Sequence, residues 1–337
     1  MNPEDSAYYA FLPDPARAAA VDRRARAAFA ESMMSLLTAF DRQGVLADGR
    51  LAGLAAMLDA GMVPPGAVAA YADLVEAIYG STPEATGVAL GALLTALEDE
   101  AGTGVRVVTI VDDDLGEGQA ERYRRLVNDD PSTPIDVRPL ADDDLATAGE
   151  RLRAGLALLD RAAPAFAGEV RALLRQVVLT RSGGEDPALA FDGASTYMLW
   201  GATVLNAERH PTRLAIAEAL VHESAHYLLF GFTLGSPLVE NDADELYASP
   251  LRADPRPMDG IVHASYVLAR LCACMRTLAA SGALSADEHA EAVRLADAHR
   301  RAFSGGRVVI AAHARLTDIG RSAFAPALAY MDGHTGA

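Results

Sequence analysis

Two histidines and a glutamate stand in the pattern H-E-x-x-H, as His222, Glu223 and His226 in the segment ALVHESAHYLLF. Histidines four residues apart share one face of an α-helix, so both imidazoles can bind the same cation. The flanking residues are largely apolar, and a buried imidazole is costly unless its ring nitrogens are satisfied. The pattern therefore predicts a metal site rather than a pair of structural histidines.

A third protein ligand must come from elsewhere, because two histidines do not complete a metal site. One class of zinc protease has a histidine six residues after the second histidine of the motif, but Phe232 stands at that position. Another class uses a glutamate, for which Glu245 is the candidate, although its segment VENDADELYASP is typical of a loop. His263, near the start of the next predicted helix, is the better candidate. In a zinc peptidase Glu223 would be the general base that activates water.

The surrounding sequence predicts an α+β fold that is predominantly helical, with a small antiparallel or mixed sheet beside the metal-binding helix. Apolar residues at helical intervals, with Pro and Gly at the segment ends, predict a helical N-terminal region over 1–103. The remainder, 104–337, is expected to form the catalytic α+β region. β-Branched and alternating segments predict strands within 105–111, 176–181 and 196–206.

Residues that commonly begin or end helices indicate the bounds of the metal-binding helix. Pro211 and Thr212 should begin it, and Gly231 should end it. A polar loop over roughly 232–258 is expected before a helix at 259–280. Further on, Ser285 and Glu288 have the spacing of a capping box, and DIGRSAFAPALAYM predicts a last helix.

Composition narrows the possible functions. The net charge of −17 argues against nucleic-acid or anionic-membrane partners. All 29 basic residues are arginine, which excludes a Schiff-base lysine and the lysine of a phosphate-binding P-loop. No run approaches the roughly 18 apolar residues that span a membrane, and the acidic N-terminus lacks the pattern of a signal peptide. We therefore expect a cytoplasmic protein, with Cys272 and Cys274 as reduced core residues; the oligomeric state stays open.

Two longer segments resemble a known family. LWGATVLNAERHPTRLAIAEALVHESAHYLLF and LYASPLRADPRPMDGIVHASYVLARL are similar to the HExxH motif-containing peptide-modification family, over about residues 196–275. The resemblance implies a peptide β-hydroxylase that uses Fe(II), 2-oxoglutarate and O2 on a ribosomally made precursor peptide. It implies His222, His226 and His263 as the iron ligands and gives Glu223 an orienting role. A facial set of three ligands suits such chemistry. The alternative is a Zn(II)-dependent peptidase with Glu223 as the general base.

The far carboxylate of 2-oxoglutarate needs a cation, which must be an arginine in a chain without lysine. Arg252 and Arg256 lie in the loop between the two predicted metal-binding helices. Arg270 follows His263 by seven residues on the same helix face. Tyr247 could add a hydroxyl donor.

An extended peptide can bind by adding a strand to an exposed sheet edge. The predicted strand over 196–206 immediately precedes the metal-binding helix, so its edge is the expected docking site. Gly201, interpreted as a possible bulge, would let a peptide approach closely.

Overall fold

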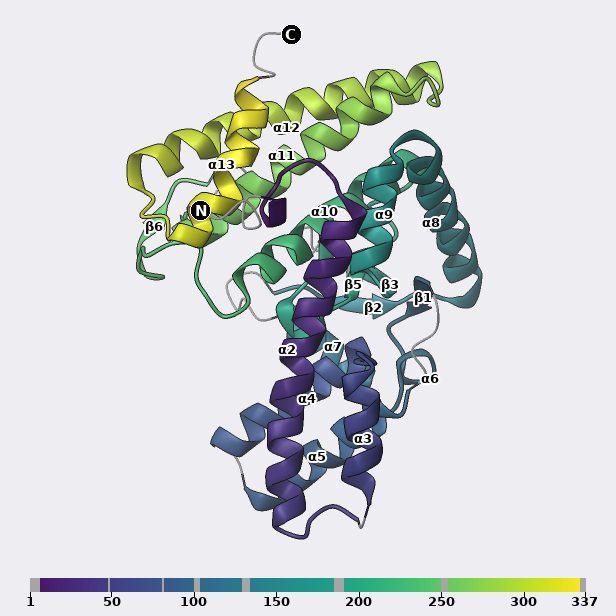
Figure 1. Cartoon of the computed structure of the whole chain (residues 1–337). Coiled ribbons are helices and arrows are strands. Elements are labelled where there is room, and N and C mark those ends of the chain that lie inside the picture. Colours follow the sequence, from purple (N-terminus) through teal and green to yellow (C-terminus); the bar gives the residue numbers. More distant parts are fainter. Residues whose placement is uncertain are drawn as a thin grey trace. The chain divides into compact units, whose positions relative to one another are not determined.

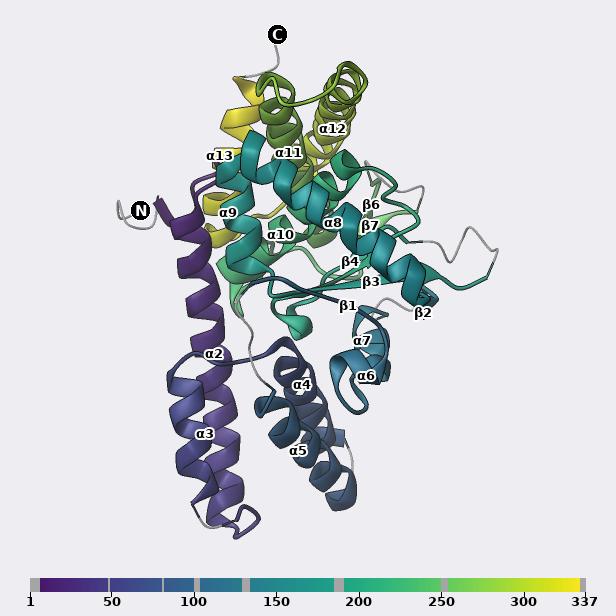
Figure 2. The ribbon, with the colours of Figure 1, turned by 90° about the vertical axis from the view of Figure 1, so that its right-hand side faces the viewer.

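The computed structural model describes residues 7–47, 49–80, 82–99, 104–128, 134–184, 191–249 and 254–333. The structure is mostly helical (67%), with a small mixed five-stranded sheet and a two-stranded hairpin. The predicted class, α+β and predominantly helical, is confirmed. Figures 1 and 2 show the helices and strands in two views at right angles.

Two compact units make up the structure, and each is built from separate stretches of chain. Unit 1 combines Met1–Ala19, Glu150–Leu173 and His210–Ala337, whereas unit 2 combines Ala20–Gly149 and Leu174–Arg209. The predicted division near residue 103 stays a prediction.

The helices predicted for the first hundred residues are present. Helix α2 begins in unit 1 and continues through unit 2, where three shorter helices follow it. Thr82 caps α5 because its hydroxyl accepts a hydrogen bond from the Ala85 amide. These helices are α2 (Pro15–Arg42), α3 (Arg50–Asp59), α4 (Pro65–Gly80) and α5 (Pro83–Leu97).

The five-stranded sheet belongs to unit 2. Its central strands are parallel: β3 pairs with β1 on one side and with β5 on the other. Strand β2 adds to β3 antiparallel, and β4 adds to β5 antiparallel. Parallel strands are usually covered on both faces, which explains the run of fully buried valine and leucine in β3 and β5. The strands are β1 (Arg106–Thr109), β2 (Val137–Pro139), β3 (Gln176–Ser182), β4 (Gly193–Ala194) and β5 (Ala202–Asn206).

The strands predicted within 105–111, 176–181 and 196–206 are all present as β1, β3 and β5, but the first part of 196–206 is not a strand. Tyr197–Leu199 forms a short 3₁₀-helix, which Thr196 caps, and β5 begins only at Ala202. Gly201 is not a bulge: its φ of 89° lies in the left-handed region that favours glycine, so it turns the chain into the strand. Its carbonyl accepts hydrogen bonds from the amides of both Arg175 and Gln176.

The peptide-docking expectation is wrong for this strand. Strand β5 is paired on both edges, with β3 along its whole length and with β4 at Val204 and Leu205. Beyond β4, the Asn206 amide bonds to the Asp192 carbonyl, and the Thr203 hydroxyl bonds to the Ala194 carbonyl. From Val204 to Asn206 both edges of the strand are therefore occupied, and an extended peptide cannot add there.

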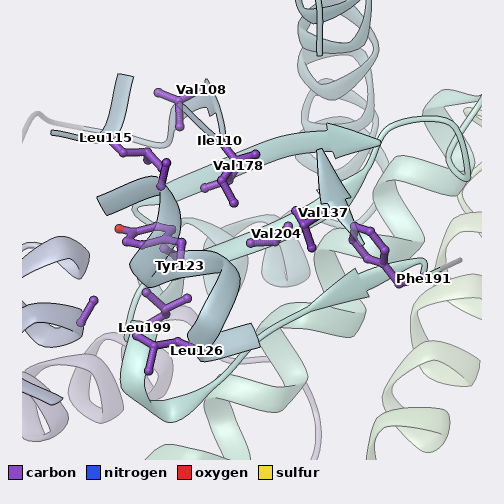
Figure 3. Packing of buried hydrophobic residues seen from close by; sticks show 13 residues of the cluster. Val108, Ile110, Leu115, Tyr123, Leu126, Val137, Val178, Phe191, Leu199 and Val204 are labelled. Atoms are coloured by element: carbon purple, nitrogen blue, oxygen red, sulfur yellow. The ribbon is translucent and has the colours of Figure 1, made fainter. Parts of the chain in front are cut away.

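One face of the sheet is covered by short helices of unit 2 (Figure 3). Tyr123 and Leu126 of α7 and Leu115 of α6 pack with Leu199 of the 3₁₀-helix into the same cluster as the strand residues. The strand residues in this cluster include Val108, Val137, Val178 and Val204, and Ile110 directly follows β1. Helices α6 (Asp112–Leu115) and α7 (Gln119–Val127) thus hold the sheet of unit 2 from one side.

Unit 1 contains the longer helices of the C-terminal half. Helices α11 and α12 form an antiparallel pair, seen side by side in Figure 1, and α10 and α13 pack against α11. The predicted capping box of α12 is confirmed, with both hydrogen bonds between Ser285 and Glu288 present. The helices are α8 (Asp142–Ala162, in unit 1 from Glu150), α9 (Pro164–Leu173), α10 (Arg213–Thr233), α11 (Met258–Ala280), α12 (Ala286–His313) and α13 (Asp318–Asp332).

Among the described helices, α11 alone is long and apolar enough to cross a membrane. Within its most apolar stretch, however, 78% is buried by the rest of the protein, as in the core helix of a folded domain. Polar residues such as His263 and Arg270 interrupt the apolar sequence of this helix, so it contains no long uninterrupted apolar run.

The two cysteines lie on α11 and agree with the prediction for them. Both Cys272 and Cys274 are free and buried. Burial raises the pKa of each thiol above its ordinary value. Neither is therefore in the thiolate form that reacts or binds metal.

Candidate metal centre

Helix α10 carries the H-E-x-x-H motif on a stripe that is only partly buried. The helix starts where predicted, because the Thr212 hydroxyl accepts a hydrogen bond from the Ala215 amide at 3.1 Å. Most residues of the helix are buried, but His222, His226 and Phe230 remain partly exposed. Their spacing of four residues puts them on successive turns of one face.

His263 lies on the second turn of α11, the helix that packs along α10. Its imidazole is partly exposed, like those of the motif histidines. The resemblance assigned His263 as the third ligand, and the structure brings it to the two histidines of α10.

The three imidazoles form a compact cluster. The ring centroids of His222 and His226 are 4.8 Å apart, and those of His226 and His263 are 4.6 Å apart. The Nδ1 atom of His226 lies 2.5 Å from the Nε2 atom of His263. Two nitrogens at this distance must share either a proton or a cation, because two lone pairs facing each other would repel.

The electrostatic environment disfavours protonation of His226 and His263. Burial lowers the pKa of His226 well below its usual range, and the neighbouring His263 and His222 lower it further. Burial, with a smaller contribution from His222, lowers the pKa of His263 to about 4. Neutral imidazole is the form that binds metal ions, so at neutral pH the cluster presents suitable donors.

The donors suit a transition metal in type, but their arrangement does not yet enclose an ion. No set of three His, Cys, Asp or Glu side chains in the described parts of the chain has the arrangement of a metal site. Two nitrogens bound at about 2.1 Å to one ion, roughly at right angles, would lie about 3 Å apart. Metal binding would thus require the His226 Nδ1 and His263 Nε2 atoms, now 2.5 Å apart, to separate by about 0.5 Å.

Glu223 follows His222 directly and is only 3% exposed. Consecutive residues of a helix point about 100° apart, so its carboxylate leaves the helix beside the histidine stripe rather than within it. This position is compatible both with the predicted orienting role and with the general base of the alternative.

A small cavity opens beside His263. Its volume is about 320 Å³, and His263 and Asp259 line it together with apolar residues and two hydroxyls. Burial raises the pKa of Asp259, which makes a neutral carboxyl easier to form there. The other lining residues are Leu229, Phe230, Thr233, Ser236, Pro237 and Leu238.

Two of the predicted cofactor-binding residues face each other on a hairpin. Strands β6 (Leu246–Tyr247) and β7 (Arg256–Pro257) pair antiparallel, with Tyr247 opposite Arg256. The hairpin lies inside the loop predicted over 232–258 and leads directly into α11. The Tyr247 hydroxyl bonds to Glu245, and Arg256 forms an ion pair with Asp254 at 2.7 Å. Arg252 lies outside the described residues.

Arg270 requires a correction. It is 1% exposed, and its guanidinium donates to the Glu169 carboxylate and to the Phe11 carbonyl. It also lies over the ring of Phe166, 4.8 Å from the centroid. A side chain enclosed in this way cannot receive the carboxylate of 2-oxoglutarate, so Arg270 has a structural role instead.

Sequence reasoning missed a second polar pair on the same face of α10. Glu218 lies one turn before His222, and its Oε1 atom is 2.6 Å from Nε2 of His299 on α12. The spacing of four residues between Glu218, His222 and His226 could have indicated the pair.

No protein-family model matches the chain, and no curated protein matches it either. The likeness to the peptide-modification family therefore depends on the quoted segments alone.

Proposed function

We propose that the chain is an iron- and 2-oxoglutarate-dependent oxygenase that β-hydroxylates a residue of a ribosomally made peptide, with His222, His226 and His263 as the metal ligands. The observation that carries the proposal is the cluster of three imidazoles from two packed helices, in which the pKa values of His226 and His263 are lowered. Such a cluster is costly without a ligand for its nitrogens. A metal ion would satisfy them and leave positions open for other ligands.

The remaining residues would position the substrate and limit water. Fe(II) bound with 2-oxoglutarate and O2 supplies the oxidising chemistry that replaces a C–H bond with C–OH. Phe230 contacts both His226 and His263, with ring centroids 6.2 and 5.3 Å away, so it shields one side of the cluster from water. The 320 Å³ cavity beside His263 is apolar with a few polar groups, which suits a peptide side chain.

Arg256 and Tyr247 are the remaining candidates for the cosubstrate carboxylate, because they oppose each other on the hairpin that leads into α11. Arg256 would have to exchange its partner Asp254, which is half-exposed, for the ligand. A bidentate guanidinium contact with a carboxylate would favour this exchange.

One observation favours the zinc peptidase as a second candidate. None of the described residues that line the cavity beside His263 is an arginine, and Arg270 is occupied by Glu169. A peptidase needs no cation for a cosubstrate. It needs the same ligands and a carboxylate beside them, which Glu223 could supply.

Metal binding is tested first, with Fe(II) added without oxygen and with Zn(II) in parallel. The intact protein should bind one ion per chain. His226→Ala and His263→Ala should each lose at least a hundredfold in affinity, because each removes a direct ligand. His289→Ala is the matched control, since His289 is an exposed histidine on α12. Equal binding by all four proteins would overturn the assignment of the ligands.

The reaction is tested next with 2-oxoglutarate itself. Many oxygenases of this kind convert some 2-oxoglutarate to succinate without substrate, so the Fe(II) protein should form succinate and the His226→Ala variant should not. Hydrolysis of an unstructured peptide mixture by the Zn(II) protein, without succinate formation by the Fe(II) protein, would replace the oxygenase by the peptidase.

A further inference from the structure

A second cavity, separate from the one beside His263, lies within unit 2. Its volume is about 790 Å³, within the range of pockets that hold small molecules. All of its lining residues belong to unit 2, whereas the histidine cluster belongs to unit 1. The walls come from α2, the turn between α3 and α4, and the residues that lead into β1 and β3, which can be located in Figure 2.

Four arginines line this cavity, in a chain whose net charge is −17. Arg23 and Arg26 come from α2, Arg106 begins β1, and Arg175 precedes β3. A net acidic chain has no general reason to gather four guanidiniums around one cavity. Guanidinium is the cation that best matches carboxylate, sulfonate and phosphate groups.

Three aspartates, Asp22, Asp59 and Asp99, also line the cavity, so the four arginines leave a formal excess of one positive charge. Asp22 already accepts hydrogen bonds from Arg26 Nε, Arg175 Nη2 and Trp200 Nε1, at 2.9 to 3.0 Å. One carboxylate thus serves two guanidiniums. Arg26 is only 8% exposed, and its Nη2 atom is buried without a hydrogen-bond partner. Asp99, also in the wall, is partly desolvated, which raises its pKa.

The electrostatics of Arg26 agree with an excess of positive charge. Burial lowers the pKa of its guanidinium, Asp22 opposes this effect, and the nearby Arg175 lowers the pKa further. An anion in the cavity would relieve the repulsion between the two guanidiniums.

The rest of the wall is apolar and includes the start of a helix. Pro64, Pro65 and Gly66 bring the N-terminus of the 16-residue helix α4 to the cavity, where the helix dipole adds positive potential. The apolar lining consists mainly of Ala27, Leu58, Ala60, Met62, Val105 and Leu115. A ligand with a charged end and an apolar body would match both parts of the wall.

We propose that the cavity of unit 2 binds a small organic anion, a carboxylate, sulfonate or phosphate ester that carries an apolar body. Arg23 and Arg106 bind its charged group, while Arg26 and Arg175, fixed by Asp22, supply the surrounding positive potential. The apolar body lies against the turn between α3 and α4.

The probe for this site is anilinonaphthalene sulfonate, which combines a sulfonate with an apolar ring system and fluoresces when it leaves water. Trp200 is the only tryptophan in the chain and donates a hydrogen bond to Asp22 in the cavity wall. A probe bound there should quench Trp200 fluorescence by energy transfer. The native protein is expected to bind one probe per chain, with quenching that follows the binding curve.

Charge and shape are tested by separate variants. The double variant Arg23→Gln/Arg106→Gln should weaken binding of the sulfonate probe on the order of tenfold, and it should leave binding of neutral phenylnaphthylamine unchanged. Ala27→Phe, which fills the cavity, should weaken both probes. The matched control is Arg24→Gln, the next residue of α2, which does not line the cavity.

Competition with inorganic phosphate tests the contribution of the charged group without that of the apolar body. Phosphate should displace the sulfonate probe only weakly, because it cannot occupy the apolar part of the wall. Loss of probe binding that is equal in the double variant and the Arg24→Gln control would overturn the proposal. Binding of the sulfonate probe without quenching of Trp200 fluorescence would also overturn it. Strong displacement of the sulfonate probe by inorganic phosphate would do the same.

Discussion

The buried carboxylate of Glu169 should be among the largest single contributors to the stability of unit 1. Its Oε1 atom accepts hydrogen bonds from Arg17 Nη2 at 2.7 Å and from the Asp14 amide at 2.9 Å, and its Oε2 atom accepts one from Arg270. The side chains of all three charged residues are at most 4% exposed. One carboxylate thus joins the N-terminal segment, α9 and α11.

The substitution Glu169→Gln keeps the volume and removes the charge. Two buried guanidiniums then lose the carboxylate that they share, and the new amide turns a donor group toward one of them. Removing one partner of a buried ion pair costs about 3–5 kcal/mol, because the remaining charge stays desolvated. Two guanidiniums share this carboxylate, so the upper part of that range is expected.

The matched control is Asp160→Asn. Asp160 pairs with Arg171 at 2.5 Å, and Arg171 lies on α9 only two residues from Glu169. Both of these side chains are nearly half exposed, at 46% and 45%. Exposed pairs contribute at most about 1 kcal/mol, so this variant should differ little from the native protein.

Urea unfolding followed by far-ultraviolet circular dichroism measures the difference. The midpoint for Glu169→Gln should fall by about 1–2 M, given a slope of a few kcal/mol per molar. Trp200 belongs to unit 2, so its fluorescence gives a separate reading of that unit. If Glu169→Gln and Asp160→Asn unfold at the same urea concentration, the buried pairs do not carry the stability assigned to them.

Three further changes have defined expected outcomes. Glu223→Gln should retain more activity than His222→Ala, by roughly ten- to a hundredfold; complete loss of activity with metal still bound would instead favour a general base. Gly201→Val should destabilise unit 2 by about 1–3 kcal/mol. The φ of Gly201 is 89°, and a Cβ atom there would lie 3.2 Å from Nη2 of Arg26. Thermal melting measures the loss, and a variant that melts at the native temperature would contradict it. Arg213 and the Ser285 amide lower the pKa of Glu288 to about 2, so their contribution to stability is present above pH 4.5 and is lost as the pH falls toward 2. In acid titrations, Glu288→Gln should be less stable than the native protein near neutrality and should lose this part of the pH dependence.

The sequence predicted the helices well because their determinants are local. The capping box of Ser285 and Glu288 and the cap at Thr212 lie within four residues of the groups that they bind. The segment around Tyr197 was harder. Its aromatic and β-branched residues favour a strand, but Trp200 donates a hydrogen bond to Asp22, 178 residues away. Propensity contains no information about such a partner.

The candidate site shows the same limit. Helical spacing placed His222 and His226 on one face, and the family resemblance supplied His263. Spacing also put Arg270 on the face of His263, but it could not reveal that Glu169, 101 residues earlier, encloses that guanidinium. The pairing of both edges of β5 could not be predicted either, because the sequence of a strand does not identify its neighbours.

The geometry of α10 limits which groups could act together on one ion. Steps of four residues advance about 400°, so the stripe winds by about 40° at each step and rises about 6 Å. Glu218 and His226 therefore differ by about 80° in direction and 12 Å in height, and they meet different helices, His299 on α12 and His263 on α11. One ion cannot bind both ends of this stripe. His222 lies between them, but its ring is 4.8 Å from that of His226, and His226 already faces a third imidazole. The proposed set of ligands therefore contains His222 and His226 of α10 with His263 of α11, and it does not contain Glu218.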